Sequence, residues 1–165
     1  MNESYPKFPE EGKKILEEPI NDSSLSSSDF IHVLNVYTFY LLYSESSIKA
    51  LKAAQKRKDL DREQMFYVDA RLAVFTVCEN GLQSLEKLLA KYPEKRQCVA
   101  ICGEQMALEY DGVRCGENTQ SAYKCYQRIF EFCPEMRNEP QTLLNFTFIC
   151  ERAGKVAEVL PLLEK

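Results

Sequence analysis

The chain has 165 residues, a formal net charge of −4 and a hydrophobic fraction of 45%, which are ordinary values for one folded domain. The mild acidity argues against a nucleic-acid partner, because phosphate binding requires lysine and arginine clustered on one face. No stretch approaches the roughly 20 consecutive apolar residues that cross a bilayer, so we expect no membrane insertion.

Seven cysteines lie between residues 78 and 150. The N-terminal residues are polar and acidic and include Pro6 and Pro9, unlike the apolar core of a secretory signal peptide. An odd number of cysteines without such a leader predicts reduced thiols rather than a disulfide framework, because intracellular compartments keep thiols reduced. We therefore expect an intracellular protein, cytoplasmic or nuclear.

Residues 1–27 are predicted to form a flexible N-terminal lead-in. Three prolines and the serine-rich run SSLSSSD oppose regular structure through most of it. Only the piece EEGKKILEE has the composition for one or two helical turns. Ser28 and Asp29 then supply side chains that cap a helix, directly before an apolar run with helical periodicity.

From residue 28 onward the apolar residues recur with a helical period, and almost nothing alternates with the period of two that marks a strand. Breaks fall where local chemistry predicts them. Asn80-Gly81 should end a helix in left-handed geometry, and Pro93 and Pro134 should each follow the end of one. The predicted helices are 29–43, 45–57, 62–77, 82–91, 96–110, 119–132, 140–152 and 155–165. Short helices joined by tight turns predict helical hairpins in series.

The hairpins recur along the chain. Units that start near residues 28, 62 and 96 are 34 residues apart, and a fourth starts near 140 after a longer loop. Equivalent positions in the four units are mostly apolar. The fourth position holds Ile31, Met65, Val99 and Leu143, and the seventh holds Leu34, Val68, Cys102 and Phe146.

Two segments carry the pattern most clearly, SAYKCYQRIFEFCPE with Ala122, Tyr126, Ile129 and Pro134, and LQSLEKLLAKYPE. In this pattern residues 28–165 resemble the tetratricopeptide repeat (TPR) family, whose 34-residue unit is a helix–turn–helix. The family's small residue at the eighth position occurs once, as Gly103, and its aromatic residue at the fourth position is missing. The resemblance implies an all-α solenoid of about four antiparallel repeats. A helical bundle or another α-solenoid is the alternative.

The C-terminal end bears on how far the repeats extend. Each hairpin carries an apolar stripe that it cannot bury alone, so neighbours stack, and the ends of such arrays need polar caps. The last predicted helix stops at Lys165, directly after LPLLE. We therefore expect a longer solenoid with further repeats, or a partner that covers this end. Pro161 should kink the last helix or delay its start to Leu160.

No motif in the chain indicates catalysis. His32 is the single histidine, and it lacks the nucleophile and orienting group that a general base usually needs. The GxSxG, glycine-rich phosphate-loop and HExxH motifs are also missing. Cys98 and Cys102 share a helix face, but a zinc site would need two more ligands, and Cys102 falls on a core position. We predict no enzyme activity, no metal and no cofactor.

The clearest functional signal is on the first helix of each predicted pair. In the resembled family these helices form the inner, concave face that binds a partner. Here the corresponding positions are mostly apolar and aromatic, which predicts an apolar helix or extended segment as ligand. The Lys/Asn/Arg constellation of chaperone-binding members is missing. The predicted groove residues are His32, Val36, Phe39, Tyr40, Phe66, Ala70, Val74, Glu104, Leu108, Leu144 and Phe148.

Two other interpretations of the groove remain open. Phe39, Phe66 and Phe148 could belong to the core, or the N-terminal segment could fold back into the groove through its apolar residues, Tyr5, Phe8, Ile15, Leu16 and Ile20. The predicted function is a non-enzymatic scaffold or adaptor that binds another protein. The alternative is a structural subunit of an obligate complex whose apolar surfaces are permanently covered.

Overall fold

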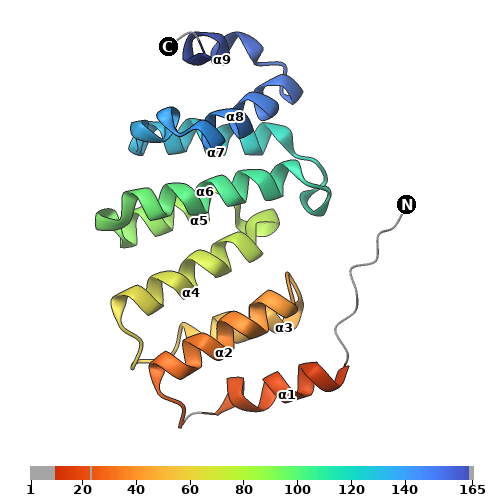
Figure 1. The fold of residues 1–165 in the computed structure, drawn as a ribbon, viewed down its shortest axis with the longest axis vertical. Helices are drawn as coiled ribbons and strands as arrows, with labels where there is room; N and C mark the ends of the chain where they lie inside the picture. The colour runs from red at the N-terminus through yellow and green to blue at the C-terminus, as the bar shows by residue number, and fades with distance from the viewer. Residues whose placement is uncertain (1–9, 23, 164–165) are drawn as a thin grey trace. The chain divides into compact units, whose positions relative to one another are not determined.

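The computed structural model describes residues 10–22 and 24–163, and this part of the chain contains helices and turns but no strand (Figure 1). The prediction of an all-α protein is therefore confirmed. The chain divides into two compact units, residues 1–72 and 73–165, with the boundary inside one helix. None of the described helices is both long enough and apolar enough to cross a membrane.

The first unit contains α1 (Glu10–Asn21), α2 (Ser27–Tyr40), α3 (Glu45–Ala54) and most of α4 (Arg62–Phe75). Serine caps begin two of these helices. Ser26 Oγ accepts a hydrogen bond from the Asp29 amide, and Ser44 Oγ accepts one from the Ser47 amide. The buried apolar residues of this unit are Phe30, Leu34, Tyr37, Leu51, Ala54 and Val68.

Helix α1 is longer than the one or two helical turns predicted for EEGKKILEE within the N-terminal lead-in, since it runs from Glu10 to Asn21. It packs against α2, and Tyr37 Oη donates a hydrogen bond to Glu17 Oε1 at 3.5 Å. Pro19 lies near the end of the helix, where an interrupted backbone bond affects only the last turn. Tertiary packing thus stabilises a segment whose local propensity is weak. Residues 1–9, including Tyr5 and Phe8, lie outside the described part, and Ile15 is exposed.

The second unit contains α5 (Val77–Lys91), α6 (Arg96–Asp111), α7 (Thr119–Phe132), α8 (Pro140–Arg152) and α9 (Val156–Leu163). Short 3-10 turns connect them, namely η1 (Pro93–Lys95), η2 (Val113–Cys115) and η3 (Pro134–Asn138). Each helix packs against the next one in sequence, and α5 also contacts α7 while α6 contacts α8. Figure 1 shows α5 to α9 following one another within this unit.

The helix ends in this unit follow local chemistry. Gly81 has φ +51° and interrupts α5 where a break was predicted, but α4 already ends at Phe75 and α5 begins at Val77, so the predicted helix 62–77 ends earlier than expected. A Cβ at Gly81 would lie 2.1 Å from Tyr110 Oη. Asn118 Oδ1 caps α7 by accepting a hydrogen bond from the Ser121 amide. Pro161 lies inside α9, which already begins at Val156, so the proline does not delay its start.

A disulfide corrects the prediction that all cysteines are reduced. Cys78 and Cys115 are bonded, with their Cα atoms 5.2 Å apart. They are 37 residues apart in sequence, so only the tertiary fold brings them together. Arg114 holds the same loop by donating to the carbonyl oxygens of Val74 and Phe75, at 2.9 and 3.0 Å. The cysteines therefore do not by themselves indicate an intracellular location.

Candidate binding surface

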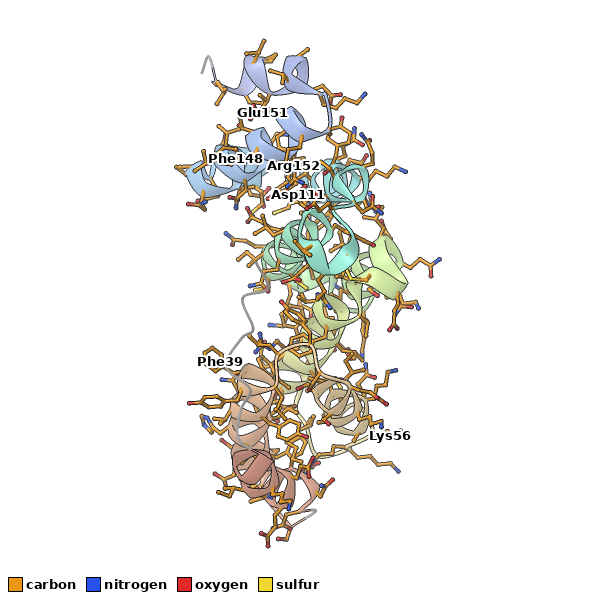
Figure 2. The ribbon with its side chains drawn as sticks, turned by 90° about the vertical axis from the view of Figure 1, so that its right-hand side faces the viewer. Phe39, Lys56, Asp111, Phe148, Glu151 and Arg152 are labelled. Carbon is orange, nitrogen blue, oxygen red and sulfur yellow. A yellow bond between two sulfur atoms is a disulfide. The ribbon has the colours of Figure 1, made fainter. Side chains whose placement is uncertain are left out.

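In the first unit the predicted groove residues of α2 are exposed. His32, Val36, Phe39 and Tyr40 face solvent, and the rings of Phe39 and Tyr40 meet edge-to-face with centroids 5.5 Å apart (Figure 2 labels Phe39). The alternative that Phe39 belongs to the core is therefore wrong, since 62% of this residue is exposed.

Two predicted groove residues of α4 also lie in the first unit. Phe66 and Ala70 are half-buried. Tyr67, the neighbour of Phe66, donates from Oη to Asn35 Oδ1 of α2 at 2.8 Å. This hydrogen bond joins α4 to α2 within the same unit.

Val74 is a correction to the predicted groove. It is only 6% exposed, and it lies in a continuous buried stretch from Ala73 to Val77. Its carbonyl oxygen accepts the hydrogen bond from Arg114, so the chain here is covered by the loop that follows α6. The resemblance to the TPR family implied that Val74 lies on an inner face, but the end of α4 and the disulfide-linked loop enclose it. Val74 is therefore a core residue.

In the second unit the remaining predicted residues gather on two adjacent helices. Glu104 and Leu108 lie on α6, and Leu144 and Phe148 lie on α8. The three apolar residues are 44%, 48% and 55% exposed, respectively. Phe148 is thus not a core residue. Together with Ile101 of α6, these four residues form a surface that we call the α6–α8 face (Ile101, Glu104, Leu108, Leu144 and Phe148).

Ile101 is absent from the predicted groove although it is 49% exposed. It precedes Glu104 by three residues and Leu108 by seven, so all three share one stripe of α6. The spacing alone could have identified it. The family positions used for the prediction skip this residue, and the prediction missed it for that reason.

Glu104 connects α6 to both neighbouring helices. Its Oε1 accepts hydrogen bonds from Tyr126 Oη at 3.2 Å and from Asn145 Nδ2 at 3.0 Å, and its Oε2 accepts one from Thr142 Oγ1 at 3.1 Å. Burial raises the pKa of Tyr126, and the adjacent Glu104 carboxylate raises it further, so the phenol remains a hydrogen-bond donor. The half-buried carboxylate is therefore held in one position.

A second connection between α6 and α8 lies about two turns further along. Arg152 Nη1 donates to Asp111 Oδ2 at 2.6 Å, and Arg152 Nη2 lies 3.5 Å from Glu117 Oε2. Figure 2 shows Arg152 and Asp111 beside each other, with Phe148 on the neighbouring turn of α8. Leu108 and Phe148 thus lie between two polar contacts of α6 with α8, Glu104–Asn145 and Asp111–Arg152. These contacts hold the two helices at a defined spacing.

The described residues offer little for other chemistry. No group of three or more His, Cys, Asp or Glu side chains in this part of the chain could hold a metal ion. Cys98 is exposed, whereas Cys102 is buried and burial raises its pKa to about 12. Cys98 and Cys102, the predicted helical pair, therefore lie in different environments.

The α6–α8 face must be interpreted from its own chemistry. It has exposed apolar side chains and a carboxylate held by hydrogen bonds, and its two helices are joined by a hydrogen bond and an ion pair. Comparisons of this chain with protein-family models, with curated proteins and with solved structures gave no match.

Proposed function

We propose that the chain is a TPR-like α-solenoid of about four helical hairpins that binds another protein and catalyses no reaction. Two features of the second unit support the solenoid. Helices contact their second neighbour as well as their first, as expected when hairpins stack in series. Gly103 is the small residue at a helix crossing, where a Cβ would meet Leu85 and Ile129 at 3.0 and 3.1 Å.

The observation that carries the binding function is the exposure of apolar side chains on the α6–α8 face. Ile101, Leu108, Leu144 and Phe148 are each about half exposed on adjacent helices. Exposed apolar residues that cluster on a surface are typical of protein-binding sites, whereas single ones are ordinary. Full burial of such a side chain contributes roughly 1.5–3 kcal/mol, and half-exposed residues would contribute less.

Rigidity also favours this face as a binding site. The cross-links Glu104–Asn145 and Asp111–Arg152 hold α6 and α8 together before any partner arrives. A surface that is already ordered loses little conformational entropy on binding, so more of the contact energy appears as affinity. An apolar helix or extended segment laid across the two helices would use this geometry.

The exposed side of α2 is a second surface of the same kind, formed by His32, Val36, Phe39 and Tyr40 in the first unit. We propose it as a separate binding surface of the first unit. We propose no metal or cofactor, and we propose an intracellular location.

Affinity purification of the full chain under cross-linking tests the function. Proteins recovered with the unmodified chain should be lost with Phe148→Asp, because a carboxylate on the face cannot be buried without a partner. They should be retained with Val113→Asp, a matched change at a residue that is 85% exposed outside the face. Helical circular dichroism must be the same for all three chains.

Recovery of the same proteins with Phe148→Asp would contradict the assignment of the α6–α8 face. Loss of the same proteins with Val113→Asp would equally contradict it, because that substitution leaves the face intact.

A further inference from the structure

The α6–α8 face has a carboxylate among its apolar side chains, and no described residue forms an ion pair with it. All three hydrogen-bond donors to Glu104 are neutral, namely Tyr126, Thr142 and Asn145. A carboxylate can accept about four hydrogen bonds, so Oε2 retains capacity for a further donor. Glu104 is therefore positioned but not neutralised.

The charged residues that follow Phe148 on α8 do not neutralise Glu104. Among the described residues, Arg152 is the cation nearest to Phe148 along α8, and it is already paired with Asp111 and Glu117. Glu151 is exposed on α8 and adds another carboxylate (Figure 2). A partner with only apolar side chains would remove Glu104 from water without compensating its charge. Burial of an uncompensated charge is unfavourable in free energy.

We propose that the α6–α8 face binds a protein segment in which a lysine or arginine is flanked by apolar side chains, and that Glu104 determines this specificity. This inference rests on the proposed function and names the class of its partner. The basic group would donate to Glu104 Oε2, and the apolar side chains would pack on Leu108 and Phe148. A charge-assisted hydrogen bond is stronger than a neutral one, and more so where water is displaced.

The spacing on α6 indicates how the basic and apolar residues of the partner are arranged. Ile101 lies three residues before Glu104, and Leu108 lies four residues after it. At a rise of about 1.5 Å per residue, each is roughly one helical turn from the carboxylate. A helical partner alongside α6 would match this with a basic residue one turn away from apolar residues on both sides.

Selection from a displayed library of random peptides, with the full chain as target, tests the inference. The unmodified chain should enrich peptides in which lysine or arginine stands among apolar residues. Glu104→Gln has nearly the same shape and retains hydrogen-bonding groups, so it should still enrich apolar peptides but lose the preference for a basic residue. Glu79→Gln removes one exposed carboxylate elsewhere in the unit and serves as the matched control.

Binding of one enriched peptide then gives the magnitude. Glu104→Gln should lower the affinity for the basic peptide roughly tenfold. It should change little the affinity for the same peptide with glutamine in place of the basic residue. Glu79→Gln should leave both affinities unchanged. The difference in affinity between the two peptides should shrink at high salt, because ions screen the partly exposed pair of the basic group and Glu104.

The two proposals fail in different ways. Peptides that depend on Phe148 but show no basic preference, or a preference unchanged by Glu104→Gln, would overturn the role of Glu104 and leave the binding face standing. Enriched peptides whose binding survives Phe148→Asp would overturn the binding face itself. A basic preference lost equally with Glu79→Gln would show a general charge effect and would also overturn the role of Glu104.

Discussion

Gly103 lies at the point where α6 comes closest to its neighbours. A Cβ built on it would be 3.0 Å from Leu85 Cδ1 of α5 and 3.1 Å from Ile129 Cγ1 and Cδ1 of α7. Glycine normally weakens a helix interior by roughly 1 kcal/mol relative to alanine. Its presence in the middle of α6 is explained by the close approach of these two side chains, which would have to shift to accommodate a larger residue.

We expect Gly103→Val to lower the free energy of unfolding by roughly 1–3 kcal/mol, because the added methyl groups would force Leu85 and Ile129 out of place. Urea unfolding followed by circular dichroism measures the change. Ala90→Val, on the exposed side of α5, is the control and should cost only the small difference in helix propensity. Equal stability of the two variants would contradict the close packing at Gly103.

The loop after α6 is joined both to the end of α4 and to the beginning of α5. The disulfide joins Cys78 to Cys115, and Arg114 donates to the carbonyl oxygens that end α4. Cations at a helix C-terminus interact favourably with its exposed carbonyl groups. The loop therefore caps one helix and is bonded to the next.

Thiol titration tests this link directly. In denaturant without reductant, five cysteines should react, and all seven should react after reduction. The double variant Cys78→Ser/Cys115→Ser should be less stable by about 2–4 kcal/mol, because the unfolded chain regains the freedom of the closed loop. Seven reactive thiols before reduction would show that the disulfide does not form.

The native protein provides an internal control for the same titration. Cys98 is exposed and should be alkylated first. Cys102 and Cys125 are buried, and burial raises the pKa of each to about 12, so little thiolate is present at neutral pH.

The exposed apolar residues of the α6–α8 face could bind either a different protein or a second copy of this chain. Two α6–α8 faces brought together would enclose four carboxylates in one contact, Glu104 and Glu151 of each copy. Like charges brought out of water are unfavourable. The face is thus better suited to a partner of opposite charge than to self-association.

We therefore expect the isolated chain to sediment as a monomer at micromolar concentration. Analytical ultracentrifugation at low and moderate salt measures this, and Glu104→Gln serves as the comparison. A stable dimer of the unmodified chain would contradict the adaptor function and favour the alternative, a subunit whose apolar surfaces are permanently covered.

Local sequence features predicted most of the helices and their ends. The bounds of α7 and α8 agree with the predicted ranges 119–132 and 140–152, because Asn118, Pro134 and Pro140 act on the adjacent backbone alone. The positions that form the inner face in the resembled family included Leu108, Leu144 and Phe148, each of which is about half exposed, but they also included Val74, which is buried.

What the sequence by itself determined was therefore the all-α class and the helix breaks at glycine and proline, which depend on interactions between near neighbours in the chain. The family resemblance supplied most of the exposed apolar positions. Only the tertiary structure decided that Glu10–Asn21 is a helix, that Val74 is buried, that Cys78 bonds to Cys115 and that Glu104 joins three helices. The physical reason is that each of these depends on residues far apart in sequence, whose proximity no local pattern records.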